Sequence, residues 1–211
     1  MKLFAAVFTT LATLASAHLE MISPCARFTS HGIDCPALPP GQSTDYSMTS
    51  PLQSGQPLCK YSTPWPTPAA TWTAGEQVTV KLAPGGATHG GGHCQFSLSY
   101  DSDKTFVVVH EIFGHCFGED QSQREFTFTL PAGLPSSKSA DFAWTWVPAM
   151  SGAPEFYMGC SNVAIKGGST PYTGKEMTIV NWGSYPVIHE FSGNYNTGME
   201  YYEKAKNITV G

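Results

Sequence analysis

EQVTVKL, residues 76–82, alternates polar and apolar side chains, which is the pattern of a half-buried β-strand. Further short runs rich in β-branched and aromatic residues follow, separated by turn residues. They are CQFSLSYD (94–101), TFVVVHEIFG (105–114), EFTFTLPAG (125–133), ADFAWTWVP (140–148), EFYMGCSNVAIKGG (155–168) and EMTIVNWG (176–183). Strands at this spacing are typical of a β-sandwich. We therefore predict an all-β fold, an immunoglobulin-like or fibronectin III-like sandwich with long loops and disulfides.

Outside these runs the chain is less regular. Residues 18–75 are rich in Pro, Gly, Ser and Thr, and we expect irregular surface chain whose cysteines staple loops that bury little. Residues 192–211 are expected to form a loop or a terminal strap. Neither a linker nor an internal repeat is visible, so residues 18–211 are predicted to form one domain.

Residues 1–17 have the pattern of a secretory signal peptide. Lys2 supplies the positive charge, a short apolar run follows, and Ala15-Ser16-Ala17 is a small-x-small cleavage site. The apolar run is too short to span a membrane. We expect a secreted extracellular protein with no membrane association, whose mature chain begins at His18.

The net charge bears on the partners of the chain, and one motif predicts glycosylation. The full chain has a net charge of −5, and removing Lys2 makes the mature chain more negative still. An acidic chain is a poor partner for nucleic acid or anionic membranes, and we expect a monomer. Asn207-Ile208-Thr209 is a sequon for N-glycosylation at Asn207.

The six cysteines, an even number, predict a disulfide framework, although six cysteines allow 15 pairings. Cys94 and Cys116 flank two strand-like runs that a hairpin would bring together, so we predict Cys94–Cys116. Cys25–Cys35 would close a local loop, which leaves Cys59–Cys160. No C-x-x-C pair is present, which argues against a structural zinc site.

A mature N-terminal His18 would offer two nitrogen donors from one residue. The α-amino group has a pKa of about 7.7–8.0, so a metal can displace its proton readily. Together with the imidazole Nδ1 it forms a chelate, and a second histidine would complete a T-shaped set of three nitrogens. Tetragonal nitrogen sites suit Cu(II). His89, in the glycine-rich segment Thr88-His89-Gly90-Gly91-Gly92, is the candidate for that second histidine, because glycines let a loop hold an imidazole at a surface.

Other histidine patterns fit known metal sites less well. His89 and His93 are four residues apart, but three glycines between them disfavour a helix. His110-Glu111-Ile112-Phe113-Gly114-His115 resembles HExxH with one residue too many, so we reject a zinc protease. The sequence has neither a nucleophile elbow nor a P-loop. A glycosidase stays open, because paired carboxylates cannot be recognised from sequence alone.

Glu155 and Tyr157 would point to the same side of a strand. Tyr157 has an alternative interpretation as a buried core tyrosine. A carboxylate beside a phenol is costly in a core but useful at a metal site.

Four strings, HLEMISP (18–24), ATHGGGHCQFSLSYD (87–101), DFAWTW (141–146) and EFYMGC (155–160), resemble fungal lytic polysaccharide monooxygenases of auxiliary activity family eleven. The similarity is strongest over residues 76–165 and at the mature N-terminus. The resemblance implies an immunoglobulin-like sandwich with a flat, copper-bearing face. It also implies oxidation of chitin or chitooligosaccharides with an external electron donor and O2 or H2O2.

Carried over by position, the resemblance assigns His18 and His89 to a histidine brace that holds one copper ion. Tyr157 would occupy one axial side of the copper, and Ala87 would shape the other. Glu155 would be the acid that positions oxygen or peroxide.

The chain departs from the family pattern in two places. Ala153-Pro154 stands where the family usually has Asn-Arg before the glutamate, and Val147-Pro148 where it has an aromatic residue and Asn. His93 and His31 look like additions near the site. Two alternatives remain: a non-catalytic copper-binding or chitin-binding protein on the same scaffold, and a secreted interaction protein in which His18 is incidental.

Overall fold

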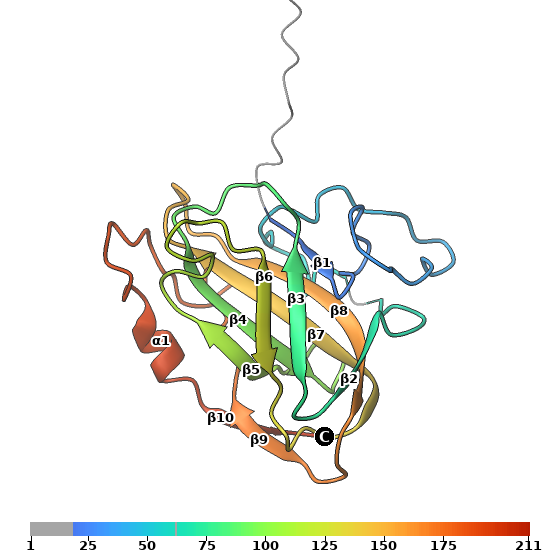
Figure 1. The fold of residues 1–211 in the computed structure, drawn as a ribbon. Coiled ribbons are helices and arrows are strands. Elements are labelled where there is room, and N and C mark those ends of the chain that lie inside the picture. The colour runs from blue at the N-terminus through green and yellow to red at the C-terminus, as the bar shows by residue number, and fades with distance from the viewer. Residues whose placement is uncertain (1–18, 62) are drawn as a thin grey trace, which may run out of the picture.

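Two β-sheets face each other in the computed structural model, which describes residues 19–61 and 63–211 (Figure 1). The larger sheet has the strand order β2-β8-β7-β4-β5, in which the β2–β8 pair is parallel and the other pairs are antiparallel. Its strands are β2 (Ala70–Thr73), β4 (Gly92–Ser99), β5 (Val107–Ile112), β7 (Ser137–Pro148) and β8 (Tyr157–Lys166).

The smaller sheet has three antiparallel strands in the order β1-β3-β6. They are β1 (Met21–Ser23), β3 (Gln77–Leu82) and β6 (Glu125–Thr129). A separate ladder pairs β9 (Tyr172–Lys175) with β10 (Asn207–Val210), and a short helix, α1 (Met199–Glu203), precedes β10. The predicted all-β sandwich is confirmed. None of the described helices is long and apolar enough to cross a lipid bilayer.

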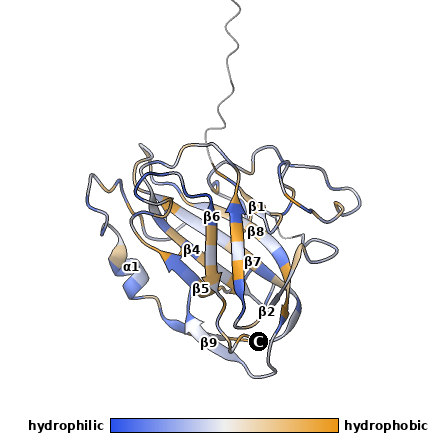
Figure 2. Cartoon of the chain, viewed as in Figure 1, coloured by the Kyte–Doolittle hydropathy of each residue, from blue (hydrophilic) through white to orange (hydrophobic). Residues whose placement is uncertain are grey.

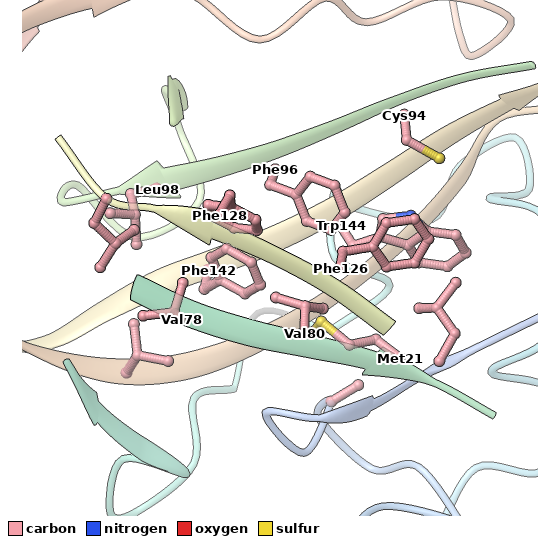
Figure 3. Packing of buried hydrophobic residues seen from close by; sticks show 14 of the residues in the cluster. Met21, Val78, Val80, Cys94, Phe96, Leu98, Phe126, Phe128, Phe142 and Trp144 are labelled. Carbon is pink, nitrogen blue, oxygen red and sulfur yellow. The ribbon is translucent and has the colours of Figure 1, made fainter. Parts of the chain in front are cut away.

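The core between the sheets follows from the alternation in the strands. Val78, Val80 and Leu82 of β3 are buried while Gln77 and Thr79 are exposed, and β3 accordingly alternates in hydropathy (Figure 2). Each buried aliphatic or aromatic side chain of this size contributes about 1.5–3 kcal/mol. Figure 3 shows the interior side chains that these residues meet, which include Phe96, Phe126, Phe128, Phe142 and Trp144.

The outer face of the larger sheet is also covered. Met177 and Val180 join a second buried cluster there together with side chains of β7 and β8. The predicted strand over residues 176–183 is wrong. Glu176 alone forms a bridge, to Val107, and the amide of Thr178 donates instead to the side chain of Gln95 over 2.9 Å. The apolar pattern of this segment therefore reflects burial against a sheet and not strand pairing.

The irregular chain before β2 buries far more than we predicted. Arg27 is 1% exposed, and its guanidinium donates to the carbonyl of Tyr61 at 2.8 Å, to Asn162 at 3.0 Å and to Asp103 at 2.6 Å, as well as to Asp141. Buried charges need such partners. The expectation that this part of the chain covers little was wrong because low periodicity does not exclude burial of a polar network.

Three disulfides are present, and their pairs match those predicted: Cys25–Cys35, Cys59–Cys160 and Cys94–Cys116. The first closes a loop within the N-terminal coil, by which we mean the irregular chain before β2. The second ties that coil to β8, and the third ties β4 to the chain after β5.

Candidate active site

The start of β4, the end of β7 and the start of β8 meet at one end of the larger sheet. The antiparallel register pairs Gly92 with Pro148 and Trp146 with Tyr157. The loop before β4 and the segment before β8, both predicted to carry site residues, therefore lie at the same end of the sandwich.

His89 is half-buried in the loop that precedes β4. Its backbone has a φ of 47°, and its carbonyl accepts a hydrogen bond from the amide of Met150 at 2.8 Å. The imidazole ring centre lies 5.7 Å from the ring of Trp146. Both contacts come from the β7 end of the site, so the placement of His89 depends on a strand far away in the sequence.

The glycine run after His89 is needed for this placement. Gly92 has a φ of 111°, and a Cβ there would lie 2.0 Å from the carbonyl oxygen of Val147. The amide of Gly92 also donates to the carbonyl of Gly114 at 2.7 Å. Because Cys94–Cys116 joins the same two stretches of chain, the base of the His89 loop is fixed both covalently and by hydrogen bonds.

The site has two halves, the loop that carries His89 and the Glu155–Tyr157 pair. Trp146 is buried and contacts both halves. Its indole Nε1 donates to the carbonyl of Gly91 at 2.8 Å, and its ring centre lies 4.5 Å from that of Tyr157. The sequence analysis did not identify Trp146 as a site residue, although it belongs to the AWTW string that carries the resemblance.

Tyr157 and Glu155 lie on the same side, as predicted, and are in direct contact, although β8 begins only at Tyr157 and Glu155 precedes it. The phenol of Tyr157 donates to Oε2 of Glu155 at 2.9 Å. The tyrosine is buried, whereas Glu155 is only partly buried. Burial raises the pKa of Tyr157, and the hydrogen bond to Glu155 and the negative charge of its carboxylate raise it further. The phenol is therefore protonated at neutral pH and presents a neutral oxygen.

The loop of residues 149–155 joins the two halves of the site. Met150, at the start of this loop, holds His89 through its backbone amide and is itself 54% exposed. Glu155 ends the loop. Side chains of the 176–191 segment contact it: Oε1 of Glu190 accepts from the amide of Gly152 at 2.7 Å, and Asn181 donates to the carbonyl of Glu155 at 3.0 Å. No sequence pattern predicted these loop contacts.

Two predicted site residues stand apart from this geometry. His18 lies outside the described residues, as does the predicted signal peptide. Ala87 is exposed in the loop before His89. Within residues 19–61 and 63–211, no group of three or more His, Cys, Asp or Glu side chains could hold a metal ion.

His93, predicted to be an addition near the site, is an internal ring. It is 1% exposed, its Nδ1 accepts from the amide of Gly114 at 3.0 Å, and its Nε2 donates to the carbonyl of Thr197 at 3.0 Å. Burial lowers the pKa of His93. It is a neutral structural histidine, because β4 directs its ring against those of Phe113, Phe191 and Tyr202.

His31 and His110 contact residues outside the candidate site. The His31 side chain is 67% exposed, with Nδ1 2.5 Å from Oε1 of the buried Glu20. The ring of His110 stacks on Phe128 with centres 4.6 Å apart.

Comparisons with known proteins give relatives of one kind. The chain is 40% identical over 166 residues to "AA11 family lytic polysaccharide monooxygenase A" of Aspergillus fumigatus, an alignment that covers 75% of this chain and 69% of the relative. It is 37% identical over 100 residues to "AA11 family lytic polysaccharide monooxygenase B" of A. fumigatus, and 33% identical over 100 residues to an AA11 enzyme of Aspergillus oryzae. The last two alignments cover 41% of this chain and 23% of each relative. No family model matches the chain.

Proposed function

Because the chain belongs to the AA11 family of lytic polysaccharide monooxygenases, we propose that it is a copper-dependent enzyme that cleaves β-1,4-glycosidic bonds in chitin or chitooligosaccharides. The observation that supports this most directly is the convergence of His89 and the Glu155–Tyr157 pair on the ring of Trp146.

Of the proposed histidine brace the structure describes His89, whose half-buried imidazole would suit a copper ligand. His18, outside the described residues, would contribute its amine and imidazole. Tyr157 adds a neutral phenol rather than a phenolate, because burial and Glu155 keep it protonated. Such an oxygen would be at most a weak ligand, which would suit a site whose strong donors are nitrogens.

Bound copper would supply the redox chemistry that removes hydrogen from a strong C–H bond, using electrons from an external donor and O2 or H2O2. The chain's own residues would bind, orient and handle protons. Tyr157 orients the Glu155 carboxylate through the 2.9 Å hydrogen bond, which leaves the other oxygen of Glu155 to accept or donate a proton. Ala87, with its small side chain, would leave room for the reacting molecules.

The setting of the site suits a polymer substrate. Ala87 and Met150 are exposed beside His89, so a chain within a crystalline solid could reach this end of the sandwich without entering a cleft. We propose secretion of a monomer after cleavage at residue 17. Asn207, exposed at the start of β10, would be its glycosylation site.

The decisive experiment is mass spectrometry of products released from β-chitin by the mature, copper-loaded protein with ascorbate. We expect oxidised chitooligosaccharides that require both copper and reductant, and none from the His89→Ala variant. Cellulose under the same conditions tests the choice of glycan. Tight copper binding without oxidised products would instead support the alternative, a non-catalytic copper-binding or chitin-binding protein.

A further inference from the structure

The loop of residues 149–155 joins His89 to Glu155, yet its own side chains do little to hold its shape. Ala153 offers only a methyl group, and Pro154 has no amide hydrogen to donate. The described internal contact is a hydrogen bond from the hydroxyl of Ser151 to the carbonyl of Ala153. The distance between the two halves of the site must therefore be set mainly from outside the loop.

The segment of residues 176–191 supplies these outside contacts. Oε1 of Glu190 accepts from the amides of Ser151 at 3.1 Å and Gly152 at 2.7 Å. The amide of Phe191 donates to the carbonyl of Ala149 at 2.9 Å, which fixes the start of the loop. At the far end, Nδ2 of Asn181 donates to the carbonyl of Glu155 at 3.0 Å.

Asn181 is itself held firmly. Its side-chain Oδ1 accepts a hydrogen bond from the backbone amide of Ile188 at 2.6 Å, and its backbone amide donates to the carbonyl of Pro186 at 2.8 Å. Its φ of 56° is in the left-handed region, which asparagine adopts more readily than most residues. The side-chain amide of Asn181 thus bridges two stretches of backbone: its oxygen accepts from Ile188, and its nitrogen donates to Glu155.

We infer that Asn181 is a positioning residue for Glu155. By fixing the carbonyl of Glu155, it fixes the backbone from which the carboxylate projects toward the phenol of Tyr157. The contacts through Met150 to His89 then set where that carboxylate lies relative to the candidate copper ligand. The inference rests on the proposed function, because it assigns Asn181 a part in the same reaction.

The test is Asn181→Asp in the mature, copper-loaded protein. This change keeps the size and the acceptor for Ile188, but it replaces the donor with an oxygen that faces the carbonyl of Glu155. A misplaced catalytic group typically costs about a hundredfold, so we expect a loss of about tenfold to a hundredfold in turnover, with copper affinity unchanged. Asn196→Asp is the matched control, because Asn196 is exposed, makes none of these contacts and would acquire the same charge.

A double-mutant cycle with Glu155→Gln separates positioning from general destabilisation. If Asn181 acts through Glu155, Asn181→Asp should have little further effect once Glu155 is Gln. Equal loss factors in both backgrounds would overturn the inference. Should Asn181→Asp fail to fold, Asn181→Gly replaces it in the cycle, since glycine adopts this φ without strain.

A spectrum that needs no turnover distinguishes failure of this inference from failure of the proposed function. The electron paramagnetic resonance spectrum of the Cu(II)-loaded protein should change in Asn181→Asp in the same way as in Glu155→Gln, and stay unchanged in Asn196→Asp. A wild type that releases no oxidised product would refute the proposed function. The spectra then decide alone: a shared change supports the positioning role, and an unchanged Asn181→Asp spectrum refutes it.

Discussion

The indole nitrogen of Trp146 donates a hydrogen bond to the carbonyl oxygen of Gly91 over 2.8 Å, and through this bond a core strand fixes the loop that carries His89. A buried carbonyl deprived of its donor costs about 1–3 kcal/mol. Trp146→Phe should lower the free energy of unfolding by about that amount and also weaken copper binding, measured by urea unfolding and calorimetric titration. The control is Trp72→Phe, another buried tryptophan of the core, which should destabilise without changing copper affinity. Wild-type copper affinity in Trp146→Phe would show that His89 is held by other contacts.

Copper binding should depend on a free amine at His18. We expect one Cu(II) per mature chain with submicromolar affinity or tighter. A form that retains Ala17 should lose most of this affinity, because its His18 nitrogen is an amide without a basic lone pair. Calorimetric titration of both forms and of His89→Ala checks this. An extended form that binds copper as tightly as the mature one would refute the histidine brace.

Glu155 and Tyr157 should affect different steps. Glu155→Gln keeps the size and removes the charge, so copper binding should survive while turnover falls by about 10²–10⁴-fold if Glu155 acts as a general acid or base. Tyr157→Phe should leave copper affinity nearly intact and change both the rate and the electron paramagnetic resonance spectrum. Rates of chitin oxidation and Cu(II) spectra of both variants test this. An unchanged rate in Glu155→Gln would show that the acid has no catalytic role.

Loss of the Cys94–Cys116 disulfide should reduce copper affinity as well as stability. Removing a native disulfide costs about 2–5 kcal/mol, and this one lies next to the glycine run that positions His89. The double variant Cys94→Ala/Cys116→Ala should show both losses in thermal unfolding and copper titration. Cys25→Ala/Cys35→Ala provides the comparison; if it lowered copper affinity equally, the effect would not be local to the His89 loop.

Stability of the copper-free protein should fall as the pH drops below about 6.5, partly because of His93. Its folded-state pKa is lowered by burial, so below the unfolded value of about 6.5 the unfolded chain takes up a proton that the folded chain does not. One such group changes the unfolding free energy by at most about 1.4 kcal/mol per pH unit. Urea unfolding at several pH values between 5 and 7.5 gives the free energy of unfolding as a function of pH. This free energy should change less with pH for His93→Gln than for the wild type.

Two patterns made the strands of the sandwich predictable. Alternation marked EQVTVKL, which became β3, and richness in β-branched and aromatic residues marked the runs around Phe96 and Trp144, which became the largely buried strands β4 and β7. Residues 176–183 failed the same test, because a segment packed against a sheet can be as apolar as a strand of it. Arg27 was missed because no local pattern marks a cation whose partners come from four distant segments.

The candidate site was predictable only where neighbouring residues in the sequence form a recognisable pattern. His89 stood out because of its glycines, and Glu155 beside Tyr157 because two residues that alternate at the start of a strand point to the same side, although the strand itself begins only at Tyr157. Asn181 and Glu190 contact the site through backbone groups of another loop, and such contacts leave no signature in sequence. The identity of His93 as an internal ring was equally hidden, since Thr197 lies in a region without periodicity.

The attachment of the N-terminal coil bears on how such an enzyme would survive proteases outside the cell. A single cut between residues 36 and 58 would separate the first residues covalently from the rest. Arg27 would still grip Asp103 and Asn162, β1 would remain paired with β3, and Cys59 would hold the downstream piece to β8. A nicked molecule would therefore keep residues 19–35 bound to the sandwich.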